Sequence, residues 1–144
     1  MYFEELKVGA SVELAPAVIE KEKMLAFARE YDDVPIHTDE EYAKSTPFGT
    51  LLAPGVMSFL VVWAKYLKVD FFGEELLAGK STKIEWEKPV FAGDTLRGVA
   101  TITDLKPRNE KNGIATLSID AFNQHGELVL TSVTEAIVKK KPVI

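Results

Sequence analysis

The longest apolar stretch of the sequence sets the main constraint on the fold. It begins at Gly55, directly after Pro54, and runs to about Leu67. Lys65 and Lys68 stand near its end, where positive charge suits the dipole of a helix. A helix that is apolar almost all round must be enclosed by other parts of the chain. We therefore expect a helix over residues 55–67 that the rest of the fold buries.

The C-terminal half of the sequence has the pattern of strands separated by turns. The expected strands cover residues 80–87, 95–105, 114–123 and 128–139, with turns at 91–94, 107–113 and 123–126. Short turns between such strands favour antiparallel hairpins, so we expect a meander of four strands. A curved antiparallel sheet wrapped around the apolar helix buries both elements, which makes an α+β fold.

The N-terminal half is expected to hold a strand and then helices. Residues 11–15 alternate in polarity up to Pro16, and residues 19–31 carry apolar side chains at helical spacing. Pro35 ends this helix and makes a turn of residues 32–34. Thr38 followed by Glu41 fits a capping box, which predicts a short helix over 39–44 with Thr38 as its N-cap.

Length, charge and cysteine usage exclude several classes of protein. The 144 residues fit one domain, 1–144, and 17 basic against 22 acidic residues, a net charge of −5, argue against a nucleic-acid partner. The absence of cysteine excludes disulfides, cysteine-based zinc sites and a thiolate nucleophile. The N-terminus lacks the pattern of a signal peptide, and no apolar run spans a membrane. We expect a cytoplasmic protein without a membrane partner.

Asp32 and His37 are the strongest candidates for chemistry. A carboxylate can accept a proton from water, and an imidazole that titrates near neutral pH can share this work. Five positions separate them, across the rigid Pro35. The alternative is a structural role for both in a capped, solvated loop. Asp39 reads as the first-turn acid of a helix and Asp33 as a solvated turn residue, so neither is a catalytic candidate.

Gly55 is of interest for its backbone. The first turn of a helix has unpaired N–H groups, which could hold the oxygen of an enolate that develops on a thioester. The alternative is that glycine only lets the buried helix begin or pack closely after Pro54. We expect Pro54, Val56 and Phe59, which surround Gly55 on the helix, to contact a substrate.

The remaining candidates favour structural roles. His125 lies in a turn and is expected to be exposed, and two histidines without a helical pair make a catalytic zinc site improbable, so we expect no metal. Ser45 and Ser58 lack a nearby base. Aromatic side chains at helical spacing are more often core than the lining of an acyl pocket. These are Phe59, Trp63, Tyr66, Phe71 and Phe72.

Three motifs resemble those of the MaoC-like dehydratases, which include the (R)-specific enoyl-CoA hydratases of the hot-dog fold. They are the segments 32–39, DDVPIHTD, 48–57, FGTLLAPGVM, and 88–96, KPVFAGDTL. The first is the most specific, and the last recurs across hot-dog proteins.

The resemblance implies both a fold and a reaction. The residues matching Asp32 and His37 activate water for addition to a trans-2-enoyl thioester, giving the (R)-3-hydroxyacyl product, and the glycine matching Gly55 holds the thioester oxygen. It also implies an acyl-CoA or acyl-carrier-protein substrate, no cofactor, and a homodimer whose two sheets are continuous.

Two positions depart from the family pattern, which usually has Asn at Val34 and often His at Pro54. Two alternatives to a hydratase or dehydratase therefore stay open. One is an acyl-CoA thioesterase, in which a carboxylate activates water against the thioester carbonyl. The other is an acyl-thioester binding protein without catalytic activity.

Overall fold

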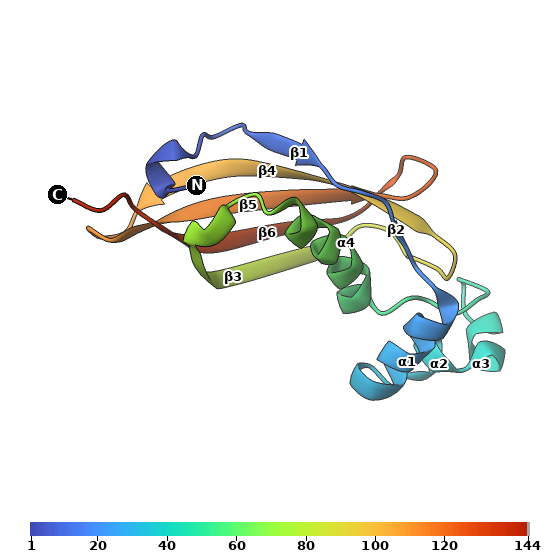
Figure 1. Ribbon diagram of the computed structural model, residues 1–144. Coiled ribbons are helices and arrows are strands. Elements are labelled where there is room, and N and C mark those ends of the chain that lie inside the picture. The colour runs from blue at the N-terminus through green and yellow to red at the C-terminus, as the bar shows by residue number, and fades with distance from the viewer. Residues whose placement is uncertain (144) are drawn as a thin grey trace.

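A computed structural model describes residues 1–143. One antiparallel sheet has the long helix α4 (Gly55–Val69) against one face, and three shorter helices gather beyond one end of the sheet (Figure 1). These are α1 (Lys21–Tyr31), α2 (Pro35–Thr38) and α3 (Glu40–Lys44), and two 3-10 turns are η1 (Phe3–Glu5) and η2 (Gly73–Glu75). The strands are β1 (Ser11–Glu13), β2 (Ala17–Val18), β3 (Leu76–Trp86), β4 (Thr95–Pro107), β5 (Asn112–Phe122) and β6 (Leu128–Lys139).

The strand order corrects the predicted meander. The sheet runs β1-β4-β5-β6-β3, with β2 paired to β4. The turns at 107–113 and 123–126 do join hairpins, β4 to β5 and β5 to β6, as predicted. The segment at 91–94 joins no hairpin, because β3 pairs with β6 across the sheet and β4 lies beside β1. The prediction of a β3–β4 hairpin is therefore wrong.

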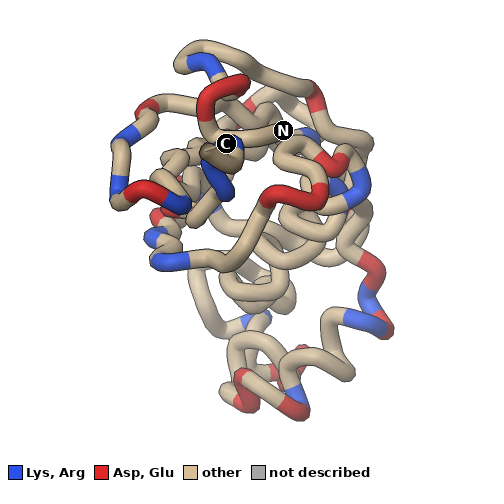
Figure 2. Tube along the Cα trace, turned by 60° about the vertical axis from the view of Figure 1, so that its left-hand side comes forward, with Lys and Arg blue, Asp and Glu red and all other residues tan. Residues whose placement is uncertain are grey.

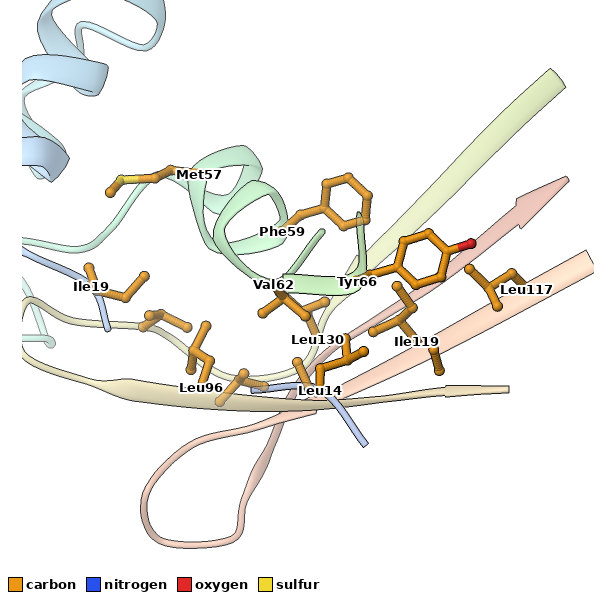
Figure 3. Packing of buried hydrophobic residues seen from close by; sticks show 14 of the residues in the cluster. Leu14, Ile19, Met57, Phe59, Val62, Tyr66, Leu96, Leu117, Ile119 and Leu130 are labelled. Atoms are coloured by element: carbon orange, nitrogen blue, oxygen red, sulfur yellow. The ribbon is translucent and has the colours of Figure 1, made fainter. Parts of the chain in front are cut away.

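The core lies between α4 and the sheet, as predicted. Val62 and Tyr66 of α4 pack over a floor of strand side chains, and Phe59 belongs to the same buried cluster (Figure 3). Residues of β5 alternate between buried and partly exposed along the whole strand, so its inner side chains reach the core. Labelled members of the floor are Leu96, Leu117, Ile119 and Leu130, and Leu14, which directly follows β1, packs beside them.

The helix α4 is less enclosed than its composition predicted. Val56, Leu60 and Leu67 on its outer face are 47%, 42% and 53% exposed. The sheet covers only one face of the helix, which leaves this apolar row on the surface of the single chain.

The element boundaries in the N-terminal half differ from prediction in three places. The predicted strand over 11–15 is divided into β1 and β2, and the predicted helix over 19–31 begins at Lys21. Residues 35–38 form the helical turn α2. Asp39, rather than Thr38, is the N-cap of α3, since its side chain accepts a hydrogen bond from the Tyr42 N–H at 3.1 Å.

The surface charge is mixed. Acidic and basic residues are interspersed along the trace (Figure 2). Within residues 1–143, no helix is both long and apolar enough to cross a membrane.

Candidate active site

The backbone after α1 positions the two candidate acid–base residues. Asp32 is the C-cap of α1, and its N–H donates to Ala28 O at 2.9 Å. Pro35 occupies the first turn of α2, where its fixed φ suits a helix start. The single turn of α2 directs the His37 side chain inward, and only 8% of this residue is exposed.

Asp32 and His37 contact one another. His37 Nε2 lies 3.3 Å from Asp32 Oδ2, and the Asp32 side chain is 41% exposed. On the other side of the ring, His37 Nδ1 lies 2.6 Å from Leu52 O. A carbonyl oxygen can only accept, so Nδ1 carries a proton and Nε2 of the neutral ring does not. The contact between Nε2 and the carboxyl group is then favourable when one proton is shared between them, which suits a pair that transfers a proton.

Backbone hydrogen bonds bring the segment before α4 to this pair. The Leu52 N–H donates to Ile36 O at 3.1 Å, and the Ala53 N–H donates to Val90 O at 2.8 Å. Leu52 also forms an isolated bridge with Phe91. The strand connection 87–94 and the helix α2 are thus held on opposite sides of the segment that leads into α4.

The start of α4 presents free N–H groups. Pro54 is the N-cap, and no side chain caps the helix. The N–H groups of a first turn have no partner within the helix, so those of Gly55 and Val56 can bind an oxygen of a ligand. The Pro54 carbonyl accepts from the Ser58 N–H at 3.0 Å and from Ser58 Oγ at 3.3 Å.

A pocket of about 370 Å³ joins these groups. Its lining is Asp32, His37, Leu52, Ala53, Gly55, Val56, Ser58, Trp86, Lys88, Pro89 and Val90. The three candidates for catalysis from the sequence, Asp32, His37 and Gly55, therefore face one hollow whose walls are mostly aliphatic and aromatic.

The three expected substrate contacts are placed differently. Val56 lines the pocket and is half-exposed. Pro54 is fully buried and Phe59 lies in the core, where its ring stacks on Trp63 at 5.5 Å. Neither residue belongs to the pocket lining.

Two further side chains line the pocket, and the sequence had marked neither of them as a catalytic or substrate-binding residue. Trp86 ends β3, and its indole Nε1–H donates to Gly55 O at 2.9 Å. Lys88 follows it, and its Nζ lies 2.5 Å from Glu127 Oε2. The motif that begins at Lys88 could have pointed to this segment, whereas no sequence pattern placed Trp86 against Gly55.

The ion pair at the pocket rim keeps Glu127 ionised. Its hydrogen bond with Lys88, and a second one from the Asn123 side chain, lower the pKa of Glu127 below its ordinary value. Lys88 is thereby held beside the pocket by a charged partner.

Three further polar candidates, His125, Asp33 and Asp39, lie outside the pocket, whereas Ser58 is part of its lining. His125 is exposed in the β5–β6 turn, as predicted. Asp33 is exposed, and Asp39 caps α3. In the part of the chain that the structure describes, no three His, Cys, Asp or Glu side chains come together as a set of metal ligands.

Comparison with known proteins gives consistent matches along most of the chain. The family model of the MaoC like domain matches residues 4–122. An (R)-specific enoyl-CoA hydratase of Rhodospirillum rubrum is 31% identical over 109 residues, which cover 76% of this chain and 74% of the relative.

Two solved structures extend the comparison to the fold. A monoamine oxidase regulatory protein of Archaeoglobus fulgidus superposes with a TM-score of 0.93 at 31% identity, covering 99% of this chain and 96% of the other. An (R)-hydratase of Aeromonas caviae involved in PHA biosynthesis superposes with a TM-score of 0.74 at 28% identity, covering 96% and 99%. The predicted hot-dog fold is therefore confirmed.

Proposed function

Since the chain belongs to the MaoC-like domain family, we propose that it is a hydratase or dehydratase that interconverts a 2-enoyl thioester and the (R)-3-hydroxyacyl thioester. The observation that carries this proposal is the contact of Asp32 with His37, at 3.3 Å, in a pocket that also holds Gly55. The relative from Rhodospirillum rubrum, named for this activity, supports it.

In the proposed reaction, the Asp32–His37 pair accepts one proton from a water molecule. The hydroxyl oxygen forms a bond to C3 of the enoyl group, and the electrons of the double bond move onto the thioester oxygen. The N–H of Gly55 stabilises this enolate, because a free donor at a helix start needs no reorganisation. The pair then returns the proton to C2, so that the net change is the addition of one water molecule.

The departure at Val34 does not remove the backbone bonds that support this geometry. The Val34 carbonyl accepts from the His37 N–H at 3.0 Å and from Thr38 Oγ1 at 3.2 Å. Its side chain is exposed and does not line the pocket. These contacts support a working acid–base pair without an asparagine at this position.

The test is hydration of crotonyl, hexenoyl, branched and dicarboxylic enoyl-CoA, followed as loss of enoyl-thioester absorbance. We expect Asp32→Asn and His37→Ala each to lower the rate by about 10²–10⁴-fold with the fold intact. Matched controls are Asp33→Asn and His125→Ala, which change the same residue types outside the pocket and should leave the rate unchanged.

Other outcomes assign other functions. Release of free thiol from acyl-CoA, measured with a thiol reagent, would identify the protein as a thioesterase and not a hydratase, because hydration releases no thiol. Tight binding of acyl-CoA without turnover would identify it as a binding protein. Full activity of Asp32→Asn would refute the proposed role of the pair.

We further propose that two copies associate through β3. Its outer edge has no partner strand within residues 1–143, and its length and exposure make it a ready template for pairing. Exposed apolar residues outside the pocket lie on β3 (Leu76 and Leu77) and on α4 (Leu60 and Leu67). The molecular mass in solution tests this, and a monomer at all concentrations would contradict it.

We also propose that the protein is cytoplasmic, which cell fractionation tests.

A further inference from the structure

Trp86 is the one large aromatic side chain in the lining of the pocket that holds Asp32, His37 and Gly55. It is 49% exposed, so packing in the core does not explain it. We propose that Trp86 is a positioning residue that orients the first peptide groups of α4, and that the Val56 N–H joins the Gly55 N–H as a second donor to the thioester oxygen. This inference rests on the hydration proposed above and names the groups that stabilise its enolate.

A hydrogen bond between Trp86 and the start of α4 is the first observation that supports this proposal. The indole Nε1–H donates to Gly55 O at 2.9 Å. This carbonyl and the Val56 N–H belong to the same planar trans peptide and point in opposite directions. A donor that fixes the carbonyl therefore also fixes the direction of the Val56 N–H. That N–H has no partner within the helix, and Val56 lines the pocket.

The preceding peptide is held in the same way by a different residue. The Pro54 carbonyl accepts from the backbone N–H of Ser58 at 3.0 Å and from its hydroxyl at 3.3 Å. Planarity of this peptide fixes the Gly55 N–H. Two successive N–H groups are thus oriented before a ligand arrives, which is what stabilisation of a developing oxyanion requires.

The approach of the ring also explains the glycine. A Cβ atom at residue 55 would lie 2.6 Å from Trp86 Cε2 and 2.7 Å from Nε1, well inside van der Waals contact. Gly55 is not among the glycines with positive φ, so backbone conformation does not require it. Gly55 and Trp86 therefore form a matched pair, in which the missing side chain admits the indole to the helix start.

The test is Trp86→Phe, which keeps an aromatic ring in the pocket wall and removes the N–H. The matched control is Trp63→Phe, which makes the same change of residue type at a tryptophan that packs against Tyr66 and does not line the pocket. With crotonyl-CoA, or the best substrate of the enoyl-CoA panel, we expect Trp86→Phe to lower kcat about tenfold and to change KM by less than about twofold. The melting temperature should match that of the control, whose kcat should equal that of the wild type.

The outcomes separate this inference from the proposed function. Wild-type kcat in Trp86→Phe, or a loss that Trp63→Phe reproduces, overturns the role of Trp86 and leaves hydration standing. A loss in Trp86→Ala that is absent in Trp86→Phe assigns the effect to ring volume and also overturns it. A wild-type protein that hydrates no enoyl-CoA overturns both.

Discussion

The substitution Gly55→Ala measures the close approach of Trp86 in a single experiment. Carbon atoms pack best at about 3.5–4.0 Å, whereas the new Cβ would lie 2.6 Å from the indole. The ring must move by roughly 1 Å, which the half-exposed side chain can do. The movement gives up the hydrogen bond to Gly55 O, a loss of about 0.5–1.5 kcal/mol.

The displaced ring also loses contact with the pocket wall. A tryptophan buries about 150–250 Å² when fully enclosed, and this one is 49% exposed. Losing half of the remaining buried area, about 40–65 Å², costs about 1–1.5 kcal/mol at 25 cal/mol per Å². The higher helix propensity of alanine stabilises the folded state by less than about 1 kcal/mol at this terminal position. The net expectation is a loss of about 2 kcal/mol in the free energy of unfolding.

Urea unfolding of the wild type, Gly55→Ala, Trp86→Ala and the double variant provides the measurement. Without the indole, the clash is absent, so Gly55→Ala in the Trp86→Ala background should be neutral or slightly stabilising. The double-mutant cycle should therefore give a coupling of about 2 kcal/mol. A Gly55→Ala variant as stable as the wild type, or the same loss in both backgrounds, would refute the packing argument.

Three further changes follow from particular contacts. Ser132→Ala should raise the free energy of unfolding by about 1 kcal/mol in a thermal or urea scan, because its buried hydroxyl has no partner within residues 1–143; a loss of stability would mean that an ordered water satisfies it. Asp94→Ala should lower the free energy of unfolding by about 2–3 kcal/mol, because the Phe91 N–H, which donates to Asp94 at 2.9 Å, and the Gln124 side-chain amide both lose their acceptor. Retained stability would contradict this. The lowered pKa of Glu127 means that its stabilising contribution is present above the ordinary value of 4.5 and is lost as the pH falls through its own pKa. Lys88→Met should weaken this acid sensitivity in unfolding scans, whereas an unchanged pH profile would dismiss the ion pair as a source of stability.

The sequence predicted the elements that depend on local pattern. The apolar period of α4, the hairpin turns on either side of β5 and the turn residue His125 all follow from neighbouring residues. The proximity of Asp32 and His37 could also be predicted from the sequence, since Pro35 fixes the short segment between them. The contact of His37 Nδ1 with Leu52 O, at 2.6 Å, could not be predicted, because it joins residues that only the tertiary fold brings together.

The placement of Phe59 outside the pocket lining could not be predicted for a similar reason. Helical spacing shows that residues share a face, but it does not show which face the sheet covers. In the structure Phe59 is turned to the core, and Val56 to the pocket. Both residues were equally good candidates until the sheet was placed.

The error in strand order and the position of the site have one cause. If β3 and β4 formed a hairpin, the segment between them would be a tight turn at the sheet edge. Instead β3 pairs with β6, and the connection crosses the end of the sheet towards β4. On this path the carbonyl of Val90 accepts the Ala53 N–H at 2.8 Å, which places Lys88, Pro89 and Val90 beside the start of α4. The crossing that the local pattern could not predict therefore supplies a wall of the pocket, and the pairing of β3 with β6 holds Trp86, the last residue of β3, in register with Leu130.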